Sequence, residues 1–374
     1  MTATRLKLGI VFGGRSGEHE VSLMSARSVL SVLDHQKYDV IQIGITRAGK
    51  WVTGENVLDA LSNRQEHLLT PAVLLPEPGK NTLYTLTESD NGLILKPLAA
   101  LDVIFPLLHG SYGEDGAPQG LFELANIAYV GAGVLGSAVG MDKGLFKDLM
   151  RAWGVPVADA IVISRAQIQT QMDQILSQAE ALAPYPLFTK PANLGSSVGV
   201  SKCHSRSDLL EGLMEAARYD RRVLVERGIR NAREIEISVL GNSDPIVSLP
   251  GEIIPSDEFY SYDAKYIDER SQLIIPAPLT PELTRKVQEI ALTVYRAVDC
   301  AGMARVDFLF DGESNELVVS EINTIPGFTR ISMYPKLWDA CGLSYPALID
   351  RLVELALERQ EDREHTERTY RRGE

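Results

Sequence analysis

The feature that most constrains the fold is a short apolar run that ends directly in two glycines. Leu6–Phe12 has the sequence LKLGIVF and is followed by Gly13 and Gly14, a pattern typical of a buried parallel strand that leads into a ligand-binding loop. Apolar residues at helical spacing follow over Val21–Leu33, and Tyr38–Ile45 has the composition of a second strand. Strand, glycine-rich loop, helix and strand in this order predict the start of a doubly wound α/β domain.

Alternating strands and helices continue along the rest of the chain. The apolar patterns predict further strands over 102–108, 187–190, 198–203, 222–227, 234–240, 304–310 and 316–322. They predict further helices over 142–153, 207–218, 281–298 and 345–359. Residues 76–92 are rich in turn formers, which predicts a surface excursion, and the charged tail 358–374 is expected to be solvated. A chain of 374 residues should form two or three domains.

Charge and cysteine content exclude several functional classes. The net charge of −13 argues against a nucleic-acid partner, because such binding needs a basic surface. It leaves room for a small phosphate ligand held by a few lysines. Cys203, Cys300 and Cys341 are far apart in the sequence, which indicates neither a disulfide framework nor a structural zinc site. The N-terminus has no signal-peptide pattern, and no apolar run approaches the roughly 18 residues of a membrane span. We therefore expect a cytoplasmic protein without membrane contact.

The first glycine-rich loop, Gly13–Glu18, ends in a carboxylate that has two interpretations. The loop resembles the dinucleotide motif GxGxxG only loosely, and no acidic residue closes the second strand where a ribose would need it, so a dinucleotide site is not favoured. Glu18 lies at the carboxyl end of a predicted strand, where it could hold a ligand ammonium. A carboxylate at a helix start also complements the helix dipole. The sequence does not choose between these two roles.

Three later loops have the composition of ligand-binding segments. His109–Gly116 has three glycines in eight residues, which indicates a backbone close to a ligand or a tight turn with a packed histidine. Lys190–Gly199 (KPANLGSSVG) has the N–H groups, hydroxyls and lysine that surround phosphate. It lacks the Walker spacing, and a flexible turn is the alternative. Glu252–Tyr266 is aromatic and charged, which predicts a long loop folded over a site or a packed surface loop.

Two strands near the C-terminus have the most specific pattern. Because side chains alternate along a strand, Arg305 and Asp307 lie on the same side of the first strand, and Glu321 and Asn323 lie on the same side of the second. An antiparallel register that places Asp307 opposite Glu321 also places Arg305 opposite Asn323. Carboxylate and amide oxygens beside an arginine suit Mg²⁺ ions that carry substrate phosphates, whereas two facing carboxylates without a cation would repel. A solvated sheet face is the alternative.

Together these motifs resemble the D-alanine–D-alanine ligases of the ATP-grasp superfamily. The resemblance runs from about Lys7 to Arg359 and rests on GGRSGEHEVS, HGSYGEDG, MDK at 141–143, KPANLGSSVGVSK, YDAKY, ARVD and EINTIPGFT. It implies an α/β ATP-grasp fold with three sub-domains. These would be a Rossmann-like N-terminal domain over 1–140, a central sub-domain over 141–225, and a C-terminal sub-domain over 226–374 with the metal and substrate sites.

The resemblance also implies residue roles. ATP would be held between the second and third sub-domains by Lys143, Lys190, Glu226, Ile229 and Glu234. Two Mg²⁺ ions, which Mn²⁺ could replace, would be bound by Asp307, Glu321 and Asn323. The two D-alanines would meet Glu18, His109, Gly327, Ser332 and Met333. Glu18, Ser196 and Tyr266 would form a hydrogen-bonded set near the attacking amine, and Lys265 and Arg305 would face the phosphate and the tetrahedral centre.

The activity implied is the ATP-driven joining of two D-alanines through an acyl phosphate, for peptidoglycan precursor synthesis, by a homodimer. A D-alanine–D-lactate ligase is one alternative, although the run Tyr262–Tyr266 (YDAKY) resembles the dipeptide-forming enzymes. A nucleotide-binding regulator without catalysis is another, although it would not need the whole set of Arg305, Asp307, Glu321 and Asn323. A dinucleotide-dependent oxidoreductase rests only on the first loop.

Overall fold

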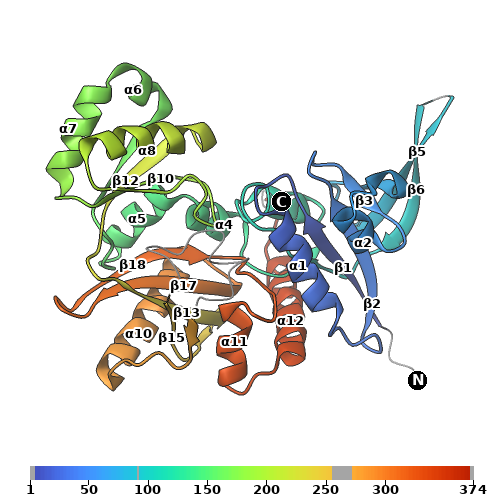
Figure 1. Cartoon of the computed structure of the whole chain (residues 1–374). Helices are drawn as coiled ribbons and strands as arrows, with labels where there is room; N and C mark the ends of the chain where they lie inside the picture. Colours follow the sequence, from blue (N-terminus) through green and yellow to red (C-terminus); the bar gives the residue numbers. More distant parts are fainter. Residues whose placement is uncertain (1–4, 91, 255–271, 371–374) are drawn as a thin grey trace.

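The computed structural model describes residues 5–90, 92–254 and 272–370. Its strands form three sheets, which follow one another along the chain (Figure 1). The first sheet has the strand order β6-β5-β4-β3-β2-β1-β7-β8. Its strands are β1 (Leu6–Gly13), β2 (Tyr38–Ile45), β3 (Trp51–Thr53), β4 (Thr70–Leu74), β5 (Thr82–Ser89), β6 (Gly92–Ala100), β7 (Val103–Pro106) and β8 (Ala128–Tyr129).

The start of this sheet confirms the α/β arrangement expected from the first residues. β1 lies between β2 and β7 and is parallel to both. Helices cover both faces, because alternate residues of β1 belong to different cores: Leu8 packs with α1 (His19–Leu30), and Val11 packs with α3 (Ala117–Leu124). Two small helical segments, α2 (Val57–Ser62) and η1 (Glu66–Leu68), lie between β3 and β4. The loops after β1 and β7 therefore emerge side by side.

Residues 76–92 lie in the surface excursion that the sequence predicts, but most of this segment forms strands that the sequence analysis did not predict. β5 and β6 pair as an antiparallel hairpin that extends the sheet at its edge, and Figure 1 shows this hairpin projecting from the molecule. The turn formers lie mainly in 76–81, and the alternating Leu, Tyr and Thr residues that follow favour a strand. Most of β6 is exposed, so the hairpin lacks the apolar alternation by which a half-buried strand is found.

The second sheet is small and antiparallel, with the order β11-β10-β12-β9. Its strands are β9 (Ala160–Ser164), β10 (Leu187–Pro191), β11 (Ser201–Cys203) and β12 (Arg222–Arg227). The helices α6 (Arg165–Thr170), α7 (Met172–Leu182) and α8 (Arg206–Tyr219) supply apolar side chains to its core. β11 is shorter than expected, since residues 198–200 belong to the loop that precedes it.

The third sheet has the order β16-β15-β13-β17-β18 with β14 beside β13. Its strands are β13 (Arg233–Gly241), β14 (Ile246–Val247), β15 (Gly251–Ile254), β16 (Gln272–Ile274), β17 (Gly302–Asp311) and β18 (Glu316–Asn323). The core beneath it includes residues of α5 (Lys143–Ala152) and α10 (Pro281–Ala297). Glu252 to Ile254 lie in β15 rather than in a loop, and the rest of the predicted loop, 255–266, lies outside the described residues.

The C-terminal part of the chain returns to the first sheet. α4 (Val134–Met141) precedes α5, and α11 (Met333–Ala340) precedes α12 (Tyr345–Glu364). Leu348 and Leu352 of α12 belong to the same core as Leu8 of β1. The expectation of a solvated tail from residue 358 is partly wrong, because α12 continues to Glu364 and Arg359 donates to the carbonyl of Tyr129 at 3.3 Å. Within the described residues, no helix is long and apolar enough to cross a membrane.

Candidate active site

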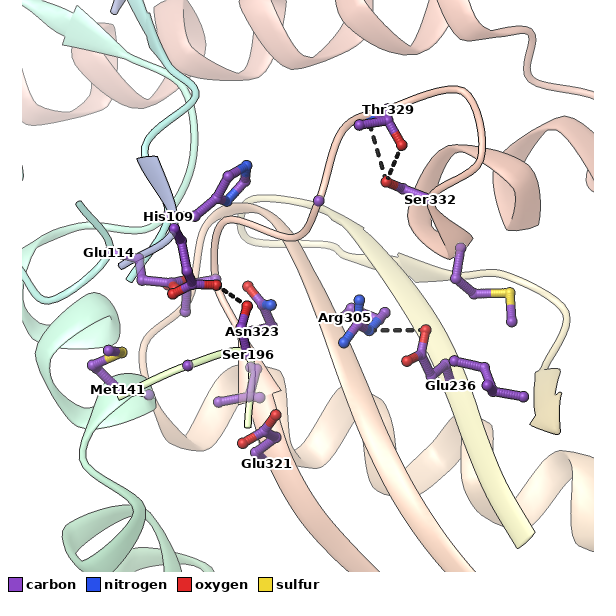
Figure 2. A pocket seen from close by; sticks show the side chains of 18 of the residues that line it. His109, Glu114, Met141, Ser196, Glu236, Arg305, Glu321, Asn323, Thr329 and Ser332 are labelled. Atoms are coloured by element: carbon purple, nitrogen blue, oxygen red, sulfur yellow. Dashed lines mark hydrogen bonds and ion pairs between the residues drawn. The ribbon is translucent and has the colours of Figure 1, made fainter. Parts of the chain in front are cut away.

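The pair of strands β17 and β18 has the register expected from the sequence. Arg305 is opposite Asn323 and Asp307 is opposite Glu321, and the register shifts by one residue beyond Asp307. Arg305 binds Asp307 through two hydrogen bonds of 2.7 Å. It also forms an ion pair of 3.0 Å with Glu236 of the neighbouring strand β13, which Figure 2 shows as a dashed line. The alternative of a solvated sheet face is excluded, because these residues line two cavities.

Glu236 is a site residue that sequence reasoning missed. Its side chain is buried, and its position on β13 is opposite Asp307. The alternation of β13 places Glu234 and Glu236 on the same face, so the signal was present in the sequence. This signal could be used only once the neighbouring strands of β13 were known, because the sequence of one strand does not tell which side chains of other strands lie beside it.

The larger cavity has a volume of about 580 Å³, within the range of small-ligand sites. All five residues expected to hold ATP line it: Lys143, Lys190, Glu226, Ile229 and Glu234. The second and third sheets both contribute to its lining, through β10 and β12 on one side and β13, β17 and β18 on the other. The geometry therefore brings together the residues that were predicted from separate motifs.

Two residues that line this cavity, Lys190 and Glu226, belong to a cluster of charges. Lys190 forms an ion pair of 2.5 Å with Glu226, and Lys147 of α5 forms a second ion pair with the same carboxylate. Burial opposes the ionisation of Glu226, but the two lysines outweigh it and lower the pKa of this carboxyl to about 2. Burial lowers the pKa of Lys147, and Glu226 opposes that effect. Lys147 was also missed, although it lies four residues after Lys143 and so on the same helix face.

Lys143 connects the two cavities. Its ammonium donates to the carbonyl of Leu194 at 2.8 Å and forms an ion pair of 3.1 Å with Glu321. Five residues line both cavities: Lys143, Gly195, Ser196, Glu236 and Glu321. The smaller cavity is thus the direct continuation of the larger one.

The smaller cavity contains most of the remaining predicted residues that the structure describes, whereas Asp307 lines the larger one. Glu18, His109, Ser196, Arg305, Asn323, Gly327, Ser332 and Met333 line it, and Figure 2 shows several of them around it. Ser332 accepts a hydrogen bond of 3.0 Å from the backbone N–H of Thr329. A Cβ at Gly327 would lie 3.0 Å from the Ser332 hydroxyl, so a larger residue would crowd that hydroxyl. Lys265 and Tyr266 lie outside the described residues.

Glu18 lies at the start of α1 and lines the smaller cavity, so its position agrees with both interpretations. It precedes α1, yet its side chain makes no capping hydrogen bond. Instead its carboxylate accepts a hydrogen bond from Ser196, a residue in the left-handed region at φ 48°. The loops that follow β1 and β10 therefore meet at this point, and two of the three residues expected to form a hydrogen-bonded set do so.

Glu114, which lines the smaller cavity, is a third residue that sequence reasoning missed. Its carboxylate accepts a hydrogen bond of 2.8 Å from the N–H of Gly110. Burial, with a smaller contribution from the charge of Glu18, raises the pKa of Glu114 to about 8. The two adjacent acidic residues of HGSYGEDG, Glu114 and Asp115, indicate a site carboxylate in this loop. The sequence does not tell which of the two side chains points into the cavity.

His109 is buried and neutral. Its Nδ1 lies 3.1 Å from the carbonyl oxygen of Ile325, and its Nε2 lies 3.0 Å from the hydroxyl of Ser25. Burial lowers the pKa of His109 to about 4, although the bond to Ile325 acts in the opposite direction. His109 therefore lines the smaller cavity and is also packed within its loop.

Comparison with known proteins identifies the family. Residues 7–132 match the family model described as D-ala D-ala ligase N-terminus, and residues 149–354 match the model described as D-ala D-ala ligase C-terminus. The chain belongs to the D-alanine–D-alanine ligase family. The ATP-grasp fold class and the resemblance seen in the sequence are thereby confirmed.

Relatives of this family cover nearly the whole chain. A D-alanine–D-alanine ligase of Heliobacterium modesticaldum is 48% identical over 366 residues, which are 97% of this chain and 98% of the relative. The ligase of Natranaerobius thermophilus is 46% identical over 361 residues, 96% of this chain and 97% of the relative.

Solved structures of the ligase family have the same fold. The D-alanine-D-alanine ligase of Coxiella burnetii has a TM-score of 0.79 and 38% identity, with 97% of each chain covered. The VanG D-Ala:D-Ser ligase of Enterococcus faecalis also has a TM-score of 0.79, with 36% identity, 94% of this chain covered and 100% of its own.

Proposed function

We propose that this ligase joins two molecules of D-alanine into D-alanyl-D-alanine for the peptidoglycan precursor of the cell wall, with conversion of ATP to ADP and phosphate. The observation that carries the proposal is the continuity of the two cavities. The larger one has lysines and carboxylates suited to a nucleotide, and the smaller one has Glu18, Arg305 and Ser332 suited to amino-acid ammonium and carboxylate groups. Residues 1–140, 141–225 and 226–374 would act as three sub-domains around them.

Lys143 and Lys190 would bind the phosphates of ATP. Both line the larger cavity, and Lys143 also reaches the smaller one, where the γ-phosphate must arrive. Glu226 and Ile229 would bind the adenine edge and Glu234 the ribose, which are neutral groups that hydrogen bonds recognise. This assignment orients ATP with its γ-phosphate toward the D-alanine site.

The residues present fit two magnesium ions. The side-chain oxygen of Asn323 is buried and has no hydrogen-bond partner among the described residues, so it is an acceptor that a cation would satisfy. No group of three or more His, Cys, Asp or Glu side chains in the described ranges is arranged to hold a metal by itself, which fits ions that take their remaining ligands from phosphates and water. Asp307, Glu321 and Asn323 would bind Mg²⁺ or Mn²⁺, which would neutralise phosphate charge.

In the first step a D-alanine carboxylate attacks the γ-phosphorus and ADP leaves, which forms an acyl phosphate. The contribution of the protein is position and charge. Glu18 would hold the ammonium of this first D-alanine, and Arg305 would release Asp307 or Glu236 to face the transferred phosphate. Lys190 would likewise exchange Glu226 for phosphate oxygens.

In the second step the amine of the other D-alanine attacks the acyl carbon and phosphate leaves. That amine must be neutral, so a proton path through Ser196 and Glu18, with Tyr266, is proposed. Ser332 and the N–H of Met333 would bind the carboxylate of the second D-alanine. Arg305 and the N–H of Gly327 would stabilise the tetrahedral oxyanion, with Lys265 near the phosphate and His109 beside the first D-alanine.

The second substrate is the part of the proposal that most needs a test. The likeness to a D-Ala:D-Ser ligase at the same TM-score means that the fold alone does not select the acceptor. Phosphate release and product mass should be compared for D-alanine, D-serine, D-lactate and L-alanine. D-alanyl-D-alanine as the main product supports the proposal, whereas a depsipeptide with D-lactate would favour that alternative. ATP binding without any product would favour a regulator.

We further propose that the ligase is a cytoplasmic homodimer that does not bind nucleic acid. Its co-substrate ATP is made in the cytoplasm, and Cys203, Cys300 and Cys341 are free thiols, which persist in a reducing compartment. Light scattering of the purified protein tests the dimer, and a mass of one chain would contradict it.

A further inference from the structure

The segment 325–328 contains Gly327, whose backbone N–H is the proposed donor to the tetrahedral oxyanion. Hydrogen bonds hold this segment on both sides of Gly327. The carbonyl of Ile325 is bound by His109 at 3.1 Å, and the N–H of Phe328 donates to the hydroxyl of Ser25 at 3.3 Å. Between these two anchored peptide units lies the unit of Pro326 and Gly327. Its N–H belongs to Gly327, which lines the smaller cavity.

The directions of these hydrogen bonds are determined. A carbonyl oxygen can only accept, so Nδ1 of His109 carries the proton that is donated to Ile325. In a neutral ring Nε2 is then an acceptor, and Ser25 must donate its hydroxyl proton to it at 3.0 Å. The hydroxyl oxygen of Ser25 remains available for the N–H of Phe328. One serine therefore orients the histidine and binds the backbone at the same time.

This arrangement is shielded from bulk solvent. Ser25 is fully buried in α1, and His109 is 4% exposed. The ring of Phe328 packs against Phe105 and Tyr345, at centroid distances of 5.6 Å each. Without the hydroxyl of Ser25, Nε2 of His109 and the N–H of Phe328 would both lose this partner in a buried site, which is costly.

We propose that Ser25 is a positioning residue of the ligation reaction, which fixes the N–H of Gly327 through Phe328 directly and through Ile325 by way of His109. The inference rests on the proposed function, because it takes Gly327 as a donor to the tetrahedral oxyanion. Glycine has few conformational limits of its own, so its N–H points in one direction only if its neighbours are held. Ser25 does not touch either substrate in this role.

The test is Ser25→Ala with Ser22→Ala as a matched control. Ser22 lies one turn earlier in α1, is equally buried, and also makes two hydrogen bonds, to the backbone of Gly13 and Leu107. Neither of those bonds reaches residues 325–328. Ser25→Ala should lower kcat about 10-fold, less than the 10²–10³-fold typical of removing an oxyanion donor outright, with KM for ATP unchanged. Ser22→Ala should lower Tm comparably but keep kcat within about 2-fold of wild type.

A second readout distinguishes positioning from a merely structural role. A dipeptide analogue with tetrahedral phosphorus at the position of the attacked carbon resembles the transition state. Its affinity should fall with kcat in Ser25→Ala, while the affinity for ATP stays constant. Unchanged kcat in Ser25→Ala, or a loss of kcat that follows Tm equally in both serine variants, would overturn the inference.

Two isosteric variants keep the test decisive if Ser25→Ala does not fold. Ser25→Thr and Ser25→Val add the same branch, but only threonine retains the hydroxyl. The threonine variant should have about 10-fold higher kcat than the valine variant, and equal values would refute the role of the hydroxyl. The proposed function is judged separately, on the product that the wild-type protein forms, and the variant ratios are measured with whichever acceptor that protein uses.

Discussion

Arg305 is the side chain on which both proposed steps depend, and its environment explains why. It is held between Asp307 and Glu236, which are mostly buried carboxylates, and it lines the smaller cavity. Arg305→Ala should lower kcat by roughly 10²–10³-fold, the scale of one lost oxyanion donor. KM for ATP should change less, because the charge acts mainly in the transition state.

Steady-state kinetics at saturating D-alanine measure this effect. Glu236 would lose its ion pair with Arg305 in Arg305→Ala, so a melting scan must show that the variant is folded at the assay temperature. A raised KM for ATP with an unchanged kcat would mean that Arg305 only binds nucleotide.

Lys147 gives a second prediction at the scale of residues. Its side chain is 2% exposed and pairs with Glu226, which also holds Lys190. In Lys147→Met, Lys190 is the remaining lysine partner of the Glu226 carboxylate among the described residues. The ion pair between Lys190 and Glu226 should therefore be stronger, and Lys190 should be less available to bind ATP. KM for ATP should rise on the order of 10-fold, equivalent to about 1.4 kcal/mol, with a smaller change in kcat.

Lys147→Arg provides the control for charge, since it retains a cation beside Glu226. Isothermal titration with ATP measures the affinity directly. Equal ATP affinity in Lys147→Met and in wild type would show that Lys147 has no part in releasing Lys190.

At the scale of elements, α12 connects the end of the chain to the first sheet. Leu352 is fully buried among residues of β1 and α1. Leu352→Ala should destabilise the protein by about 2–5 kcal/mol, from lost apolar burial and the cavity left behind. Since Leu352 lines neither cavity, kcat at a temperature where the variant is folded should stay near the wild-type value.

Urea denaturation followed by fluorescence measures this loss. Glu358→Ala on the exposed side of the same helix is the control, and it should change stability by no more than about 0.5 kcal/mol. Similar midpoints for the two variants would contradict a stabilising role for the α12 contact.

At the scale of the whole molecule, ATP and metal should stabilise the protein together. The larger cavity lies between the second and third sheets, so a bound nucleotide contacts both. A ligand at 100 times its Kd adds about 2.7 kcal/mol to the free energy of unfolding. Mg-ATP should therefore raise Tm, and excess EDTA with the same ATP should remove most of that rise, because uncompensated phosphate charge would face Asp307 and Glu321.

Differential scanning calorimetry with ATP, with Mg-ATP and with Mg²⁺ alone separates these contributions. An equal rise in Tm with and without metal would argue against the three proposed metal ligands.

The sequence by itself determined the local features of this protein. The alternation of β17 and β18 and the short connection between them were sufficient to predict the pairs Arg305–Asn323 and Asp307–Glu321, because register depends on residues close in sequence. The glycine-rich loops and their lysines were recognisable for the same reason. The hairpin of β5 and β6 was missed because its exposed residues carry no burial pattern.

Only the tertiary structure decided which distant groups meet. Ser25, His109 and Ile325 are separated by 84 and 216 positions, and no local pattern predicts that one hydrogen-bonded chain joins them. The same holds for Lys147 with Glu226 and for Arg305 with Glu236. Such contacts depend on how the sheets pack, and packing is the sum of many weak interactions over the whole chain. The sequence thus determined the types of side chain at the site, and the packing of the three sheets determined their partners.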